Sequence, residues 1–328
     1  MGFFRTNWIP IGLTLLFFVS IASSQFKKKS QSAMATFSTF DSHTEEWIAP
    51  DTLMIPATAA GEDIRYGREL IINTAKYLGP KGIVAALSNG MNCQNCHIDA
   101  GIKPFGNCFS AVASTYPKYR DRSGRVESIE FRINECMERS LNGQALDSNS
   151  LEMRAMVAYL KWVGSGVPHN FKPRGAGSEE LPYLQRAADT IKGKGVYIRR
   201  CQRCHGADGS GVKAPDGASF VYPPVWGPDS YNVSAGMYRL SRLAGFIKNN
   251  MPFDSVLLGY KLSNEEAWDV AAYINSQPRP QKRFACDWPD IARKPVDHPF
   301  GPYTDGFSEQ QHKYGPFEPI KKKKSLSH

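Results

Sequence analysis

Four of the seven cysteines belong to two copies of one five-residue pattern, in which two cysteines enclose two other residues and a histidine follows. The copies are Cys93-Gln94-Asn95-Cys96-His97 and Cys201-Gln202-Arg203-Cys204-His205. In this pattern the two thiols form thioether bonds to a c-type haem and the adjacent histidine binds the iron. We therefore predict two covalently bound c-type haems: Cys93 and Cys96 attach the first and His97 binds its iron, and Cys201 and Cys204 attach the second and His205 binds its iron.

A zinc site built from the two cysteine pairs is the competing interpretation. The pairs lie far apart in the chain, and each is followed by a histidine that a four-thiolate zinc site does not need. The chain also begins like an exported protein, as described below. These three features favour haem.

The haem iron at the second motif has either a sixth ligand or an open coordination position. This difference separates electron carriers from catalysts. The candidates are Met237 and Met251. Met251 precedes Pro252 and lies in the loop before the last helix of its unit, where cytochrome c domains present their methionine. Met237 lies in the segment 235–246, which is expected to be helical, so we expect it to pack. Ligation of the second haem by His205 and Met251 would raise its potential and make it the electron exit.

The first motif has no Met-Pro pair at the matching place, and its candidate ligands, Cys136 and Met137, lie in the segment 128–143. Three interpretations follow from the spacing alone. Cys136 binds the iron; or Met137 binds it while Cys136 is a buried apolar residue; or Cys136 forms a disulfide with Cys108 or Cys286. The three cysteines outside the haem motifs are an odd number, which suggests at least one free thiol.

Arginines are concentrated around Cys136. In a helix, Arg132, Cys136 and Arg139 would share one face, and two guanidiniums beside a thiol favour the thiolate. The loop before this helix carries three more arginines, namely Arg120, Arg122 and Arg125. They form either a solvated basic loop or, together with Arg132 and Arg139, a pocket for a small oxyanion next to the first haem.

Apolar periodicity and capping signals place helices before and after each motif. The expected helices are 61–78, 128–143 with Ser128 as N-cap, 148–163, 187–200, and 263–275 with a Ser263/Glu266 capping box. The sequence thus predicts an all-α fold of two tandem cytochrome c domains with an irregular C-terminal tail. The predicted divisions are a signal peptide at 1–24, an N-terminal extension at 25–60, domain 1 with the catalytic haem at 61–170, a linker at 171–182, domain 2 with the electron-transfer haem at 183–283, and the tail at 284–328. The lysine run 321–324 is expected to be a frayed, solvated end rather than a docking patch.

The N-terminus has the pattern of a secretory signal peptide, with Arg5, an apolar run over 8–22, and then Ser23 and Ser24. The run is shorter than the roughly 18 residues expected of a spanning helix, which favours cleavage and export to the periplasm. The lysines at 27–29 oppose translocation, so an uncleaved anchor that tethers the protein to the membrane is the alternative.

The chain of 328 residues has a formal net charge of +9, and removal of residues 1–24 takes away one arginine and leaves +8. Haem propionates would lower this charge further. We expect no nucleic-acid partner for an exported chain of this kind, and a small anion or an acidic redox protein instead.

Several segments resemble the dihaem thiosulfate dehydrogenases of bacteria, over about Gly61 to Ile320. The segments are Gly90–His97, Lys103–Asn107, Arg132–Cys136, Arg139–Gly143, Asn250–Pro252, Lys294–Asp297, Gly301–Tyr303 and Gln311–Phe317. The resemblance implies a periplasmic oxidoreductase that joins two thiosulfates into tetrathionate, reversibly in some members, and exchanges electrons with an acceptor or donor such as another cytochrome c.

The resemblance also implies that Cys136 is the distal ligand of the catalytic haem and Met251 a ligand of the second. Arg122, Arg125, Arg132 and Arg139 would then hold thiosulfate near the first haem. Some members have a lysine at the position of Asn250 that can exchange as a ligand, and this expectation is not transferred to an asparagine. The alternative function is a dihaem electron carrier without its own substrate, which would favour methionine ligation of both haems; a dihaem peroxidase is a weaker alternative.

Overall fold

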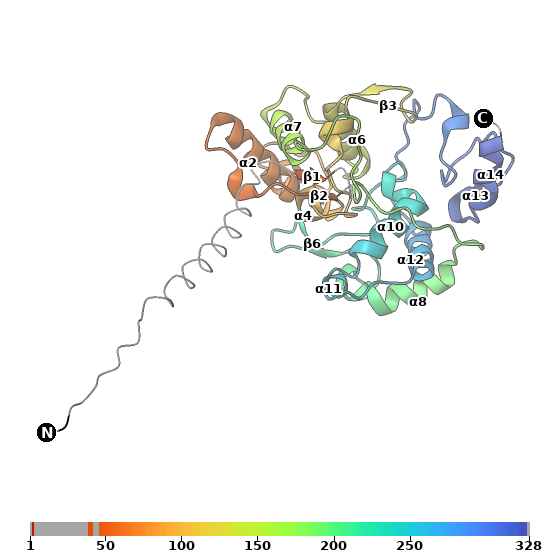
Figure 1. Cartoon of the computed structure of the whole chain (residues 1–328). Helices are drawn as coiled ribbons and strands as arrows, with labels where there is room; N and C mark the ends of the chain where they lie inside the picture. The colour runs from red at the N-terminus through yellow and green to blue at the C-terminus, as the bar shows by residue number, and fades with distance from the viewer. Residues whose placement is uncertain (1, 3–38, 42–45, 327–328) are drawn as a thin grey trace.

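The computed structural model describes Gly2 and residues 39–41 and 46–326 (Figure 1). Apart from Gly2, the predicted signal peptide lies outside the described residues, as does much of the predicted N-terminal extension. Within the described part of the chain, every helix is too short or too polar to cross a membrane.

The chain is mainly helical, and its few strands form three separate two-stranded antiparallel sheets, β1-β2, β3-β4 and β5-β6. The first half contains β1 Thr39–Asp41, β2 Glu46–Ile48, η1 Thr52–Met54, α2 Ala59–Ile72, α3 Thr74–Leu78, η2 Cys93–Asn95, α4 Ile98–Gly101, α5 Val112–Thr115, β3 Lys118–Arg120, β4 Arg125–Glu127, α6 Ile129–Arg139 and α7 Leu151–Val163. The second half contains α8 Thr190–Arg200, α9 Gln202–His205, β5 Val212–Lys213, β6 Phe220–Tyr222, η3 Gly236–Tyr238, α10 Leu240–Asn250, α11 Phe253–Leu257 and α12 Asn264–Ser276. The tail contains η4 Ile291–Arg293, α13 Glu309–Tyr314 and α14 Glu318–Leu326.

The two halves are built on the same helix crossing. In the first half α2 packs against α7, and in the second half α8 packs against α12. Each crossing is centred on a glycine: a Cβ on Gly67 would lie 1.9 Å from the carbonyl oxygen of Ala155, and a Cβ on Gly193 would lie 1.9 Å from that of Asp269. The missing side chain lets the two backbones touch, so the same close approach holds together both units.

Local capping signals begin α6 and α12 where the sequence predicts them, whereas α7 and α8 begin later than expected, at Leu151 and Thr190, and α6 ends earlier, at Arg139. The side chains of Ser128, Ser150 and Ser263 accept hydrogen bonds from the backbone at the starts of α6, α7 and α12, and the Ser263 capping box is present. Two expectations are wrong. The helix expected over 61–78 is broken at Asn73 into α2 and α3, and the one expected over 235–246 is a short 3-10 turn followed by α10.

The tail is more regular than expected, because the lysine run 321–324 lies on α14 rather than in a frayed end. Ile320 on this helix is fully buried, and the Lys321 ammonium lies 5.8 Å from the ring centroid of Tyr183. Lys324 donates a hydrogen bond to the carbonyl of Lys294. These contacts fasten the end of the chain to the second half and to the rest of the tail.

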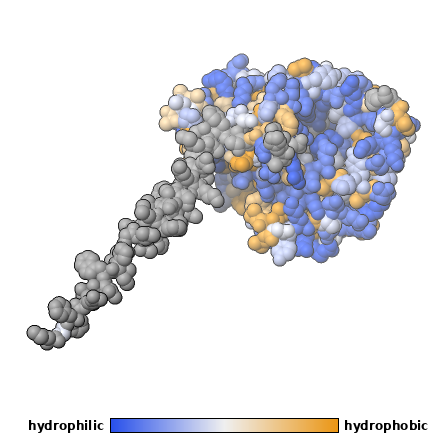
Figure 2. All heavy atoms as spheres, viewed as in Figure 1, coloured by the Kyte–Doolittle hydropathy of each residue, from blue (hydrophilic) through white to orange (hydrophobic). Residues whose placement is uncertain are grey.

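Buried apolar side chains form one cluster that extends through both halves and includes Phe317 and Ile320 of the tail. The visible surface is mainly hydrophilic, with scattered apolar residues (Figure 2). The haem motifs are therefore held in a single packed body rather than in two loosely tethered units.

The glycine crossing leads to a stability prediction. Gly193→Ala should lower the free energy of unfolding by roughly 1–3 kcal/mol, because the new methyl group must push α8 away from α12. Gly195→Ala on the same helix is the matched control, since a Cβ there meets only the end of the flexible Arg199 side chain. The control should be neutral or stabilising by up to about 1 kcal/mol. Denaturant unfolding of the two holo-proteins, followed by circular dichroism, measures both effects, and equal destabilisation by the two variants would contradict the prediction.

Candidate active site

The first haem motif starts at η2 and ends at His97, whose ring is fixed from two sides. Its Nδ1 atom lies 2.6 Å from the carbonyl oxygen of Asn107, and the ring stacks on Phe109 with centroids 4.3 Å apart. A carbonyl accepts only from a protonated nitrogen, so Nδ1 carries the hydrogen and Nε2 is left free to bind a metal. Burial lowers the pKa of His97 to about 4, which keeps the imidazole in the neutral form that an iron ligand requires.

The second haem motif is arranged in the same way. His205 donates from Nδ1 to the carbonyl of Pro223 at 2.8 Å, and burial lowers its pKa. Beside it lies a cavity of about 490 Å³ with a mainly apolar lining. Lining residues that can attach or ligate a haem are Cys201, Cys204, His205, Met237 and Met251. An apolar cavity of this size beside two free thiols and an oriented histidine fits a c-type haem.

The two haem sites lie close together, because the second cavity is also lined from the first half by Met91, Cys96 and Ile98. Cys96 belongs to the first haem motif. Residues of the first haem motif and its neighbours thus border the second haem site, which suits electron transfer between the two.

Cys136 and Arg132 on α6 face the first haem motif. Burial, with a smaller contribution from the neighbouring Cys136, raises the pKa of Cys96 to about 12. Electrostatic interaction with Cys136 is also the main cause of a raised pKa for Arg132, and the Arg132 charge in turn contributes to the lowered pKa of His97. Electrostatic effects of this kind require short distances. Cys136, the predicted distal ligand, and Arg132 therefore lie close to the first haem motif. The neighbouring candidate Met137 is 1% exposed and belongs to the apolar core.

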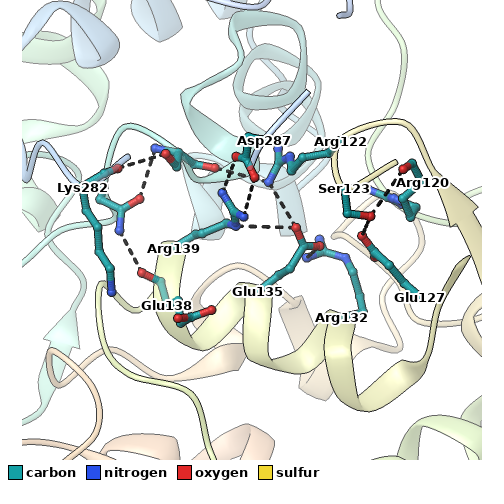
Figure 3. A network of polar contacts seen from close by, with 12 residues as sticks. Arg120, Arg122, Ser123, Glu127, Arg132, Glu135, Glu138, Arg139, Lys282 and Asp287 are labelled. Atoms are coloured by element: carbon teal, nitrogen blue, oxygen red, sulfur yellow. Dashed lines mark hydrogen bonds and ion pairs between the residues drawn. The ribbon is translucent and has the colours of Figure 1, made fainter. Parts of the chain in front are cut away.

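The buried carboxylate of Glu135 joins three of the predicted arginines (Figure 3). Its oxygens lie 3.3 Å from Nη1 of Arg132, 3.5 Å from Nε of Arg139 and 3.8 Å from Nη1 of Arg122. The Glu135 side chain is only 3% exposed, so these charges interact with little screening by solvent. Burial lowers the pKa of Arg122 to about 10, which still leaves its guanidinium charged at neutral pH.

The tail supplies a second carboxylate to this network. Asp287 pairs with both Nη atoms of Arg139, at 2.6 and 2.9 Å, and the Arg139 guanidinium also stacks over Phe284 at 3.9 Å. The Arg139 guanidinium is therefore occupied mainly by partners of its own chain. Arg132, with a side chain 34% exposed and adjacent to Cys136, is the arginine best placed to meet an incoming anion.

Arg125 does not join this group. It lies on β4, is exposed, and stacks over Phe131 with its guanidinium 4.0 Å from the ring centroid.

Three residues near the site were not singled out from the sequence, namely Tyr116, Glu135 and Asp287. The pKa of Tyr116 is raised mainly by burial, and the charges of Arg132 and Cys136 also act on it. The spacing of Glu135 from Arg132 and Arg139 is a helix ion-pair signal that could have identified it, whereas Asp287 has no local signal.

None of the three cysteines outside the haem motifs, Cys108, Cys136 and Cys286, forms a disulfide in the structure. The disulfide interpretation of Cys136 is therefore wrong, and the thiol is available for ligation. Cys108 is buried and Cys286 is exposed.

Two family models match the chain: "SoxA/TsdA, cytochrome c domain" over residues 84–169 and "Cytochrome c" over residues 191–278. Together with the two haem sites, they define a dihaem c-type cytochrome. The chain is 39% identical to the thiosulfate dehydrogenases of Stutzerimonas stutzeri (strain A1501) and Allochromatium vinosum, over 71% of this chain and 72% of the first relative, and over 70% of this chain and 83% of the second. The chain belongs to the thiosulfate dehydrogenase family.

A solved structure supports the same fold. The thiosulfate dehydrogenase (TsdBA) of Marichromatium purpuratum aligns with a TM-score of 0.66 and 33% identity over 75% of this chain. The alignment covers 51% of the solved chain, so the present protein spans about half its length. These matches confirm the predicted tandem cytochrome c fold, the two c-type haems and the assignment to the oxidoreductases.

The tail contact to Arg139 leads to a second stability prediction. Asp287→Ala should lower the free energy of unfolding by about 3 kcal/mol, because it leaves the guanidinium of Arg139, with a side chain only 8% exposed, without its main partner. Asp121→Ala is the control: it removes another ion pair between the first half and the tail, to Arg293, but both side chains are largely exposed, at 44% and 55%. The control should cost less than about 1 kcal/mol. Thermal or denaturant unfolding of both holo-proteins decides, and a similar cost for the two variants would show that burial is not the cause.

Proposed function

We propose that this chain oxidises two thiosulfate anions to tetrathionate beside Cys136 and passes the electrons out through the second haem site. In the reaction the outer sulfurs of two thiosulfates form one S–S bond and two electrons are released. Membership of the thiosulfate dehydrogenase family supports the reaction. The observation that carries the site is the position of Cys136 and Arg132 next to the first haem motif.

The bound haems supply one-electron acceptors. The chain's own residues select and position the anions. Arg132 offers a partly exposed guanidinium next to the Cys136 sulfur, where it can hold the oxygens of a thiosulfate while the outer sulfur meets that thiol. Arg122 and Arg139 add positive charge behind it, and Glu135 keeps the three guanidiniums in fixed positions.

The second site is proposed to be the electron exit, with His205 and Met251 as the iron ligands. Both Met237 and Met251 line the cavity, but Met237 is already engaged: its sulfur accepts a contact of 3.8 Å from the amide of Asn107. This contact favours Met251. Val221 and Phe253 line the same cavity while remaining largely exposed, so they mark the rim at which another redox protein, such as a cytochrome c, can approach. We propose a periplasmic location, with membrane attachment only if the N-terminal segment is retained.

Replacement of Cys136 tests the reaction site. Cys136→Gly should lower thiosulfate oxidation and tetrathionate reduction by about 100-fold or more, since both directions use the same sulfur contact. Covalent haem content should stay at two, because the haem-attachment cysteines are unchanged. Steady-state assays in both directions, together with near-infrared spectra that detect thiolate-ligated ferric haem, provide the measurement. Cys286→Ser, at an exposed thiol, is the control and should leave activity and spectra unchanged.

Near-normal thiosulfate oxidation by a Cys136→Gly protein that contains both haems would refute this site. The alternative function is a dihaem electron carrier. It would be favoured if the unaltered protein shows the spectra of both haems but turns over neither thiosulfate nor tetrathionate.

The two methionines at the second site give a separate test. Met251→Gly should lower the potential of the second haem by on the order of 100 mV, within the range of about 0.8 V that axial ligands cover. The thiolate signal of the first haem should remain. Met237→Gly is the matched variant and should shift the potential much less. Spectroelectrochemical titration of both proteins measures the shift, and a larger shift for Met237→Gly would reverse the ligand assignment.

A further inference from the structure

A second, smaller cavity of about 130 Å³ lies where the loop after β3, the segment 233–239 and the tail meet. Its lining is strongly basic, with Arg122, Arg239, Arg283 and Lys294, against one lining carboxylate, Asp287. Cavities that hold organic ligands are larger, at about 300–1,000 Å³. The size and charge of this cavity suit a small anion.

Two of the four basic groups are already neutralised in part. Arg239 forms a close ion pair with the buried Asp297, at 2.6 Å, and Arg122 is 3.8 Å from Glu135. The lining carboxylate is not available to the others, because Asp287 is paired with Arg139.

Lys294 and Arg283 have no carboxylate within ion-pair distance among the described residues. The Lys294 ammonium donates to the backbone carbonyls of Phe300 and Pro302, at 3.1 and 3.0 Å, and the residue is only 7% exposed. The Arg283 guanidinium stacks over the Phe300 ring at 4.0 Å. A buried ammonium is costly, and burial lowers the Lys294 pKa although the charge of Glu309, beyond ion-pair distance, acts in the opposite direction. An anion in the cavity would remove this cost.

We propose that this cavity binds one small sulfur oxyanion, sulfate or thiosulfate, at a site separate from Cys136. Arg283 would offer its fork of N–H donors and Lys294 a point charge, which are the two groups proteins use for tetrahedral oxyanions. The site depends on charge and size and does not rest on the proposed reaction.

The new site communicates with the proposed reaction site through Arg122. Its guanidinium lines the cavity and also interacts with Glu135, the residue before Cys136. An anion in the cavity competes with Glu135 for Arg122. Glu135 then interacts less with Arg122 and more strongly with Arg132.

Calorimetric titration of the resting, oxidised holo-protein tests the proposal at constant ionic strength set with chloride. Sulfate should bind, and Arg283→Glu should weaken its binding at least tenfold through charge reversal at the cavity. Arg293→Glu is the matched control: this tail arginine is exposed, lies outside the cavity and should leave the affinity within about twofold. Arg283 is itself exposed, so its variant is expected to fold, which haem spectra verify.

Crystals soaked in selenate locate the anion directly, because selenium scatters anomalously. A selenium peak between Arg283 and Lys294 supports the site. A sulfate affinity that is weakened by Arg283→Glu and not by Arg293→Glu also supports it. Equal weakening by both variants, or the absence of selenium density in the cavity, overturns it. A parallel titration with thiosulfate compares the unaltered protein with Arg283→Glu, so that only binding lost in the variant is assigned to the cavity. Similar cavity affinities for the two anions indicate a general sulfur-oxyanion site, cavity binding of thiosulfate alone a substrate-selective one, and cavity binding of neither refutes the proposal. Because no turnover is measured, a failure of the proposed reaction would leave this result unaffected.

Discussion

The buried charge of Glu135 determines how α6 is attached to the rest of the molecule. Three guanidiniums converge on this carboxylate, and the one on Arg139 passes the connection on to Asp287 in the tail. Without the two acids, the arginines would repel one another in a region where water screens poorly. The same ion pairs that make burial of the arginines possible therefore fix the helix that carries Cys136, and they bind the last segment of the chain to the first half.

The network leaves a small positive excess, since three arginines face two carboxylates. That excess matters for a reaction that brings two dianions together. At 4 Å two such anions repel by about 4 kcal/mol even with the dielectric constant of water, and by more in a protein site. One net positive charge offsets only part of this repulsion, and in the proposed reaction the partly exposed Arg132 would provide most of the local attraction. The pairing of Arg139 with Glu135 and Asp287, by contrast, holds α6 in position and leaves this arginine with little charge to attract an anion.

Features encoded by neighbouring residues could be predicted from the sequence, and features that depend on distant contacts could not. The haem motifs, the N-cap serines and the Ser263 capping box are local, and they lie where the sequence predicts them. The break at Asn73 and the non-helical residues before α10 are not visible in apolar periodicity, because periodicity continues across a short interruption. The partner of Arg139 lies 148 residues away in the tail, so no spacing rule could identify it. The lysine run lies in a helix because Ile320 packs into the core, which composition alone does not show.

The two halves share a scaffold and differ in the side chains that surround the haem motifs. Gly67 and Gly193 make the same backbone contact, and the histidine of each haem motif donates to a backbone carbonyl, so the repeated geometry orients both histidines in the same way. The second half adds methionines in an apolar cavity, which suits an electron carrier. The first half presents a thiol on a helix whose charges require a carboxylate from the tail. The tail is thus part of the surroundings of Cys136, and the difference between the two halves depends on a segment that belongs to neither cytochrome c repeat.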